Sequence, residues 1–230
     1  MPAISPVLVV AAHPDDEVLG CGATIARLAA EGDEVYVAIL AEGMTSRFGE
    51  RGEADRSKMK SLHANAQEAA RLLGVKELTL HGFPDNRMDT VPLLDVVKTV
   101  EQLVSRIKPV RIYTHSGGDL NIDHTVVSRA VLTATRPTQD CAVKEIFQFE
   151  IPSSTDWAFQ QFGGSFRPNV FVNITQTLET KIRAMACYGS ESRSFPHPRS
   201  SEALRANAQR WGAVAGCNAA EAFQLVRAIV

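Results

Sequence analysis

Histidine and carboxylate side chains are concentrated in two short segments of the chain. The first, HPDDE at residues 13–17, brings together one imidazole and three carboxylates, and the second is DLNIDH at residues 119–124. Each segment follows an apolar run, over residues 7–12 and 110–114, that is typical of a buried strand. Carboxylates this close repel one another unless a cation or hydrogen bonds compensate their charge. Acidic residues also suit the first turn of a helix, but that capping role leaves His13 unexplained.

Side chains from both segments together have the composition of a metal site. Strands one and four are neighbours in the common doubly wound sheets, on either side of the point where the strand order reverses. The two segments then face each other across one crevice, where His13, Asp16 and His124 supply two imidazoles and one carboxylate. Such a set suits zinc with a fourth position open to water, and the same ligands suit ferrous iron. We therefore predict a zinc site, with Fe²⁺ as the alternative metal.

Other common catalytic and nucleotide-binding motifs are missing from the sequence. Gly20-Cys21-Gly22 follows the first strand, but Ile25 occupies the position where the GxGxxG fingerprint of dinucleotide-binding proteins requires glycine. These glycines are better explained by close packing of a helix on the sheet. The chain also lacks GxSxG and GxxxxGK[ST], so neither a serine nucleophile elbow nor a P-loop is supported. The isolated His63 and His81 are interpreted as ordinary core or surface residues.

The elements that position these residues alternate between strand and helix over the first 150 residues. Short apolar runs predict strands, and periodic stretches that end at glycine or before proline predict helices. The expected strands cover residues 7–12, 34–40, 77–80, 110–114 and 145–149, and the expected helices cover residues 17–31, 57–73, 92–107 and 123–135. This alternation predicts an α/β, Rossmann-like doubly wound fold. Its mainly parallel sheet has helices on both faces and a strand order near 3-2-1-4-5.

The remainder of the chain is less regular. It contains an expected strand at residues 170–174 and expected helices at residues 175–187, 201–214 and 219–229. We interpret residues 151–230 as an irregular helical extension of a core at residues 5–150, so that residues 1–230 form a single domain. Two long segments that follow strands, residues 41–56 and 81–91, are expected to be functional loops at the binding edge of the sheet.

Composition narrows the classes of function. With 45% hydrophobic and 22% charged residues, the 230-residue chain has the balance of a globular protein. A net charge of −2 without a basic stripe argues against nucleic-acid binding. The four cysteines form no CxxC pair and are expected to be free thiols of an intracellular protein. The N-terminus lacks the positive segment of a signal peptide, and no apolar run approaches the roughly 18 residues of a membrane span, so we expect a cytoplasmic protein.

The two acidic segments also resemble the motifs of a known family. AHPDDE at residues 12–17 resembles the signature of the LmbE-like or PIG-L family of zinc-dependent N-deacetylases. DxNxDH at residues 119–124 is similar to the second metal motif of that family. The resemblance spans residues 5–150, and the stretches FPDNRMDTVPLLD and FPHPRS look like a bacterial branch that acts on sugars.

The resemblance implies a site and a reaction. Zinc would be held by His13, Asp16 and His124, and Asp15 would be the general base. The family removes the acetyl group from N-acetylated sugars and sugar conjugates, and its members often form trimers or hexamers. Zinc polarises an amide carbonyl and lowers the pKa of bound water, and a carboxylate beside that water takes its proton. The chemistry of these groups therefore agrees with the reaction that the resemblance implies. We therefore expect a small N-acetylated sugar as substrate, no nucleic-acid partner, no membrane span and a homo-oligomer.

One position departs from the pattern of the family. Many members have histidine where this chain has Asn121, and asparagine donates a hydrogen bond but carries no charge. Asn121 is therefore expected to bind substrate. His197, held between two prolines in a stiff loop, is predicted to protonate the amine or to stabilise the oxyanion, with His115 as the reserve candidate. Asp123 and His115 are otherwise expected to lie behind the metal ligands and support them.

Arginines in the two long loops are candidate substrate contacts. Arg47 and Arg87 are predicted to bind substrate because a guanidinium suits phosphate or carboxylate, as in a nucleotide- or phosphate-linked sugar. Arg51 is interpreted as solvent-exposed.

Two other functions stay open: an amidase acting on a different sugar-thiol conjugate, and a non-catalytic sugar- or nucleotide-binding module on the same fold. A binding module has no need of a base beside its metal, so Asp15 favours the enzyme.

Overall fold

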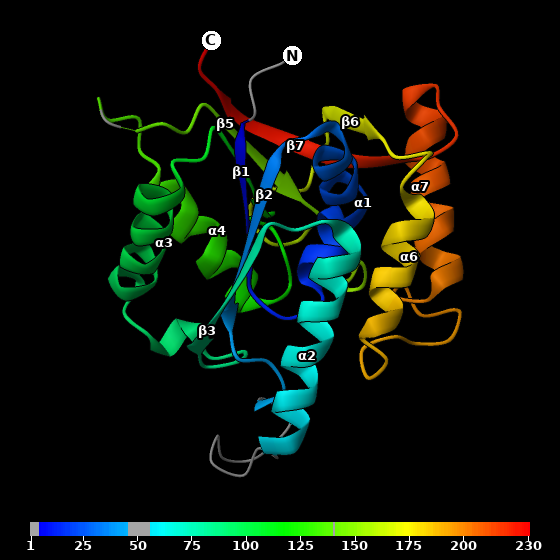
Figure 1. Ribbon diagram of the computed structural model, residues 1–230, viewed down its shortest axis with the longest axis horizontal. Coiled ribbons are helices and arrows are strands. Elements are labelled where there is room, and N and C mark those ends of the chain that lie inside the picture. Colours follow the sequence, from blue (N-terminus) through cyan, green and yellow to red (C-terminus); the bar gives the residue numbers. More distant parts are fainter. Residues whose placement is uncertain (1–4, 46–55, 140) are drawn as a thin grey trace.

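A computed structural model describes residues 5–45, 56–139 and 141–230, which form a seven-stranded sheet with helices on both faces (Figure 1). The strands are β1 (Pro6–Ala11), β2 (Glu34–Ala41), β3 (Glu77–Phe83), β4 (Arg111–His115), β5 (Glu145–Phe149), β6 (Val170–Asn173) and β7 (Ala220–Ala228). The helices are α1 (Asp16–Glu31), α2 (Arg56–Leu73), α3 (Leu93–Ile107), α4 (Ile122–Ala134), α5 (Ser154–Trp157), α6 (Leu178–Cys187) and α7 (Ser201–Ala215), with a 3₁₀ turn, η3 (Met88–Thr90), before α3.

The order of strands across the sheet is β3-β2-β1-β4-β5-β7-β6. The first five strands of the chain pair in parallel. The α/β fold predicted from the sequence and its 3-2-1-4-5 order are therefore confirmed. β7 runs antiparallel to both β5 and β6, so the C-terminal part of the chain extends the same sheet.

One predicted element is wrong: the segment at residues 219–229 forms strand β7 rather than a helix. Its sequence, AEAFQLVRA, contains good helix formers, so the local propensity favours a helix. The edge of β5 instead supplies backbone partners for this segment. Phe223 is fully buried, and its ring packs on Tyr113 with 5.1 Å between the ring centroids. Strand pairing and burial therefore override the local propensity, and the C-terminal extension is partly β.

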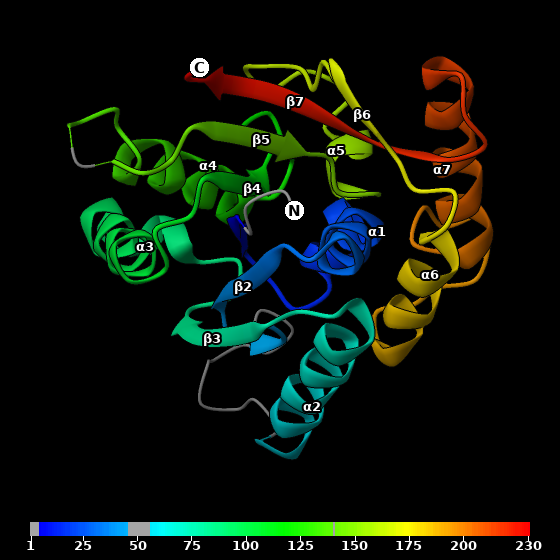
Figure 2. The same ribbon diagram turned by 45° about the horizontal axis from the view of Figure 1, so that its top comes forward.

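Side chains of β1 alternate between two apolar cores, one on each face of the sheet. Val7 and Val9 pack with α1, α2 and α6, whereas Leu8 and Val10 pack with α3 and α4. Figure 2 shows these two groups of helices on opposite sides of the sheet. Because both faces are covered, the strand reads as one continuous apolar run. Within the described residues, every helix falls short of the length or the apolar character needed to cross a membrane.

Helix α1 lies directly on the sheet at Gly20. A Cβ at this position would clash with the ring of Phe149, which is fully buried and has no room to move. This close approach confirms the packing role predicted for the glycine. The helix ends at Gly32, whose φ of 97° suits a residue without a side chain, and the glycine N–H donates to the carbonyl of Ala29 at 3.1 Å.

The carboxyl ends of β1, β3 and β4 meet at one edge of the sheet, where open α/β sheets bind their ligands. The segments that follow β1 and β4 carry the histidines and carboxylates predicted to do chemistry, and the segment that follows β3 carries Arg87. The segment between α6 and α7 reaches the same edge, because Arg199 contacts Asp15 there. The fold therefore brings residues from both ends of the chain to one place.

Candidate active site

Three side-chain donor atoms, from the start of α1 and from α4, face one another. Nδ1 of His13 and Nε2 of His124 each lie 3.2 Å from Oδ2 of Asp16, and the two nitrogens lie 3.3 Å apart. Tetrahedral zinc, with bonds of about 2.0–2.1 Å, separates its ligand atoms by roughly 3.3 Å. The spacing of the three donors therefore fits zinc, and these are the three residues predicted from the sequence to bind it.

The surroundings of these donors are negatively charged. Burial alone would lower the pKa of His124, but the carboxylates of Asp16 and Asp119 raise it to about 9. Burial opposes ionisation of Asp16, yet His124 and His13 hold its pKa well below the usual range. Buried ionised carboxylates need a compensating cation. A divalent metal bound by the three donors meets that requirement.

An outer carboxylate lies beside the second ring nitrogen of each histidine. Nε2 of His13 lies 2.9 Å from Oδ2 of Asp123, and Nδ1 of His124 lies 3.0 Å from Oδ1 of Asp119. Asp123 also accepts two backbone N–H groups, at 2.6 and 2.9 Å, so both of its oxygens are engaged. Asp85 approaches the same nitrogen of His13 at 3.3 Å, but the contact with Asp123 already occupies that side of the ring. Metal-binding histidines are commonly oriented in this way.

His115 lies behind the candidate metal ligands. It is fully buried, its ring stacks on His124 with 4.0 Å between centroids, and its Nε2 accepts the N–H of Ala12 at 2.8 Å. Burial, together with the charge of His124, lowers the pKa of His115 well below its usual value. A neutral imidazole that accepts a backbone N–H is better suited to support the candidate ligands than to donate a proton.

The carboxylate of Asp15 is not among the three candidate donor atoms and pairs with Arg199 instead. The backbone of Asp15 has a φ of 105° and a ψ of −26°, and Oδ2 of its carboxylate accepts a hydrogen bond from Nη1 of Arg199 at 2.8 Å. Asp15 is only 2% exposed, and Nε of Arg199 also donates to Oγ of Ser153 at 3.2 Å. The candidate base is thus separate from the candidate ligands, which is the arrangement that the predicted role of Asp15 requires.

Arg199 is a functional candidate that the sequence analysis missed. It belongs to the same FPHPRS stretch as His197. Nδ1 of His197 accepts the backbone N–H of Arg199 at 3.1 Å, and the His197 ring meets the edge of Trp157 with 5.4 Å between centroids. His197 does not line the pocket formed by His13, Asp15 and Asp16, whereas Arg199 does. The signal in the sequence was the proline-flanked loop, which carries Arg199 as well as His197.

Two of the candidate ligands, His13 and Asp16, and the candidate base Asp15 line a pocket of about 170 Å³. Its described lining includes the charged or titratable residues His13, Asp15, Asp16, Asp85, Glu191 and Arg199. Amide groups of Asn86 and Asn121 complete the polar part of the wall. The pocket therefore presents many hydrogen-bonding groups around the candidate metal position.

The residues predicted to bind substrate lie in different surroundings. Asn121 lines the pocket, but its Oδ1 accepts the N–H of Asp123 at 2.9 Å and so caps α4, and its Nδ2 donates to Asn86 at 2.8 Å. Arg87 is exposed and is not part of the pocket lining. Arg47, like Arg51, lies outside the described residues.

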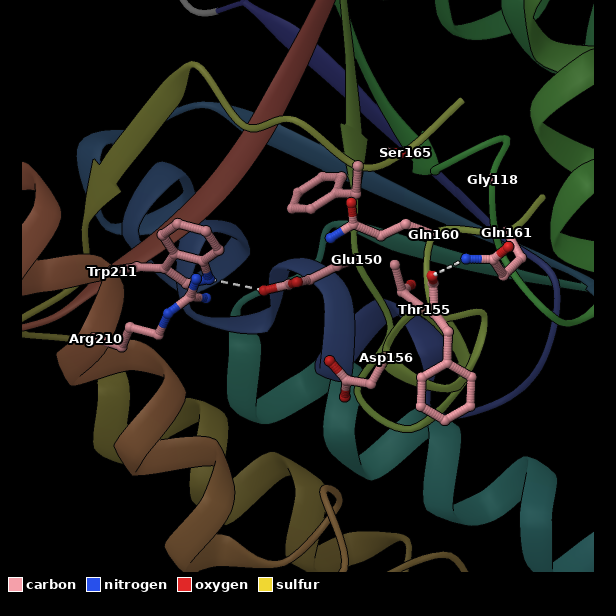
Figure 3. Close-up of a pocket in the computed structure, with 11 residues that line it drawn as sticks. Gly118, Glu150, Thr155, Asp156, Gln160, Gln161, Ser165, Arg210 and Trp211 are labelled. Atoms are coloured by element: carbon pink, nitrogen blue, oxygen red, sulfur yellow. Dashed lines mark hydrogen bonds between the residues drawn. The ribbon is translucent and has the colours of Figure 1, made fainter. Parts of the chain in front are cut away.

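A larger cleft of about 710 Å³ lies between α7 and the segment around α5 (Figure 3). Several of its polar side chains are engaged with one another: Nε1 of Trp211 donates to Oε1 of Glu150 at 2.7 Å, and the guanidinium of Arg210 lies over the indole ring at 4.1 Å. Within the described residues, the groups of histidine and carboxylate side chains that could hold a metal include no residue of this cleft. We therefore assign the chemistry to the smaller pocket.

Comparisons with known proteins give the family of the chain. The model of the family described as PIG-L, GlcNAc-PI de-N-acetylase, matches residues 8–135, which include both acidic segments. The uncharacterized deacetylase YaiS of Escherichia coli K12 is 31% identical over 185 residues, covering 78% of this chain and 88% of the relative. The chain therefore belongs to the PIG-L family, a family of deacetylases, which are enzymes that act on amides.

Two further comparisons extend over most of the chain. The probable N-acetyl-alpha-D-glucosaminyl L-malate deacetylase 2 of Bacillus cereus is 26% identical, with 82% of this chain and 84% of the relative covered. GalB, the 4-carboxy-2-hydroxymuconate hydratase of Pseudomonas putida KT2440, superposes with a TM-score of 0.75 at 22% identity, over 99% of this chain and 98% of that one. The second likeness shows the fold alone, and because one fold carries different reactions, activity has to be argued from the site.

Proposed function

We propose that the chain is a metal-dependent hydrolase that removes the acetyl group from an N-acetylated amino sugar or sugar conjugate, with zinc as the metal. The observation that carries the proposal is the division of roles between two adjacent aspartates. Asp16 joins His13 and His124 at 3.2 Å, whereas Asp15 turns to Arg199 at 2.8 Å. Such a division supplies a metal site and a separate base in one pocket.

The reaction follows from the positions of these groups. When bound by His13, Asp16 and His124, zinc supplies Lewis-acid polarisation of the amide carbonyl and lowers the pKa of water. Asp15 lines the same pocket and takes a proton from the attacking water. Asp15 then returns a proton to the amide nitrogen, because an amine leaves only after protonation. Arg199 holds the Asp15 carboxylate in one orientation during both transfers.

The polar lining of the pocket supports a sugar as substrate. Sugar hydroxyls both donate and accept hydrogen bonds, and the lining offers carboxylates such as Asp85 and Glu191 beside the amides of Asn86 and Asn121. Among the described lining residues, four carboxylates stand against one arginine, so an uncharged sugar suits this part of the pocket better than a phosphate-linked one. The description of the family, GlcNAc-PI de-N-acetylase, names an N-acetylglucosamine unit and so supports an N-acetylated sugar as the part of the substrate that reacts.

The sequence-based proposal that His197 protonates the leaving amine or stabilises the oxyanion is kept as a second route for the proton. His197 lies next to Arg199 in the chain segment that reaches the pocket, and its Nε2 is the ring nitrogen that the contact with Arg199 leaves available. Substitution of His197 distinguishes a mechanism in which Asp15 alone transfers the proton from one in which His197 also takes part.

A screen for acetyl loss tests the proposed function. Zinc-loaded protein is incubated with a panel of N-acetylated sugars, sugar conjugates and nucleotide sugars, and products are followed by mass spectrometry. We expect loss of one acetyl group from at least one uncharged sugar, abolition of this activity by a chelator, and its return when zinc is added. Ligand binding without acetyl loss would favour the non-catalytic binding module, and full activity of metal-free protein would contradict the metal-dependent mechanism.

A further inference from the structure

The turn that carries Asp15 has a backbone conformation that its sequence does not favour. The N–H of Asp16 donates to the carbonyl of His13 at 3.2 Å and closes a four-residue turn with Pro14 and Asp15 at its centre. Proline suits the second position of a type II turn, but the third position needs a positive φ and is usually glycine. Asp15 occupies it with a φ of 105°. Other contacts must therefore hold this turn in place.

The buried carboxylate of Glu17 provides one such contact. Oε2 of Glu17 accepts the backbone N–H of Asp15 at 3.1 Å, and Oε1 accepts the O–H of Tyr188 at 2.6 Å. Glu17 is 2% exposed and Tyr188 is fully buried, and neither lines the pocket. Both residues therefore act through Asp15 and have no route to direct contact with substrate.

Helix α6 fixes the position of Tyr188 independently of the active site. Tyr188 directly follows the helix, and Nζ of Lys181, on the same helix, donates to the carbonyl of Leu19 at 2.8 Å. Helix α6 thus holds the first part of α1 at two points, one at Leu19 and one at Glu17. The hydroxyl of Tyr188 reaches the Glu17 carboxylate from a firmly packed element.

We propose that Glu17 and Tyr188 are positioning residues for Asp15. Their hydrogen bonds hold the strained turn so that the carboxylate of Asp15 faces the pocket while the carboxylate of Asp16 faces His13 and His124. Replacing either residue releases the turn and moves the base, although the metal ligands stay in place. The kinetic part of this inference rests on the proposed function, in which Asp15 is the base.

Tyr188→Phe tests the proposal because it removes one hydroxyl and keeps the ring. We expect kcat to fall roughly ten-fold, with KM and zinc content unchanged. The same change placed on Asp15→Asn should cause no further loss, because the tyrosine acts through a base that is already gone. Tyr113→Phe, which also removes a buried phenol hydroxyl but on β4, is the matched control and should leave kcat unchanged. Glu17→Gln is the second variant if Tyr188→Phe folds poorly.

Equal losses of kcat in the wild-type and Asp15→Asn backgrounds would overturn the proposal, since they would indicate a general structural role. A crystal structure of Tyr188→Phe gives a readout that does not depend on activity. We expect the positive φ of Asp15 or its contact with Arg199 to change there and not in Tyr113→Phe. An unchanged turn would overturn the proposal even if the protein has no deacetylase activity, so its failure is distinguishable from failure of the proposed function.

Discussion

The contact between Arg199 and Asp15 joins the segment between α6 and α7 to the turn that precedes α1. The guanidinium nitrogen lies 2.8 Å from the carboxylate, and both groups are largely withdrawn from water. Burial opposes ionisation of Asp15 and raises its pKa, while the charge of Arg199 lowers it. A base that must take up and return a proton benefits from a partner that fixes its orientation.

Arg199→Ala should therefore lower kcat more than His197→Ala does. We expect kcat to fall roughly a hundred-fold in Arg199→Ala, which is the lower end of the usual contribution of general base catalysis. In His197→Ala we expect kcat to fall by a factor of about ten or less. The measurement is steady-state kinetics on the substrate found in the screen, and Arg193→Ala, an exposed arginine in the preceding part of the loop, is the control. A larger loss in His197→Ala, with loss of the basic limb of the pH–rate profile, would instead assign proton donation to His197.

At the residue scale, the sequence could predict that three donor residues come together, but not the contact of Arg199 with Asp15. His13, Asp16 and His124 stand out because their types and their places at strand ends suggest one shared ligand. Arg199 meets Asp15 across 184 positions of sequence. Its proline-flanked loop is visible in the sequence, but the contact of that loop with Asp15 is not. Asn121 is the opposite case. The family pattern suggests a role in the reaction at this position, but the side chain of Asn121 caps α4, which is a structural role.

At the scale of the elements, helix α1 contains a kink at Cys21, and a buried ion pair lies next to this kink. Cys21 has non-helical angles, φ −148° and ψ 22°, inside the helix. The carboxylate of Glu221, on β7, accepts the N–H groups of Ala23 and Thr24 at 3.1 and 2.7 Å and receives the Lys181 ammonium at 2.6 Å. The strand therefore caps the second part of a helix that carries the active-site turn at its start.

Glu221→Ala should destabilise the protein strongly. The change leaves the Lys181 ammonium buried without its anion and frees two helical N–H groups, and breaking a buried pair in this way costs about 3–5 kcal/mol. Glu179→Ala is the control, because it removes an exposed partner of Arg205 and should cost about 1 kcal/mol or less. Urea unfolding gives both free energies, and equal losses for the two variants would contradict the capping role of Glu221.

The elements show where sequence patterns are reliable and where they are not. Strand β1 is apolar along its whole length because both of its faces are buried, so its nature could be read locally. Strand β7 could not, because its alanines and glutamate favour a helix and only the edge of β5 makes it a strand. Non-local pairing of this kind leaves no periodic signal in the segment itself.

At the scale of the whole molecule, the C-terminal segment both completes the sheet and contributes residues to the candidate active site. β7 covers β5 and pairs with β6, while Tyr188 and Arg199 reach the turn that carries Asp15. We therefore propose that residues 1–230 fold as one domain and that the sequence-based core at residues 5–150 does not stand alone.

A chain that ends at residue 150 should fail to fold cooperatively. It would expose the edge of β5, uncover the ring of Phe149 and lose the anion that caps α1. Circular dichroism during heating measures this, with the full chain as control. A sharp unfolding transition in the truncated chain, at a temperature close to that of the full chain, would contradict the single-domain proposal.

A further prediction concerns the assembly of the molecule. The resemblance to the family predicts a homo-oligomer, a trimer or a hexamer, which light scattering of the purified protein would measure. A monomer at micromolar concentration would contradict this prediction.

The separation of base from metal ligands is the central claim, and Asp15→Asn tests it most directly. Metal content and acetate release are measured on the same preparation of this variant, with His124→Ala as the matched variant in a ligand position. We predict that Asp15→Asn keeps about one zinc per chain and loses roughly 10²–10⁴-fold in rate, whereas His124→Ala loses most of its metal. An Asp15→Asn protein that loses its zinc, or one that keeps both zinc and full activity, would contradict the account.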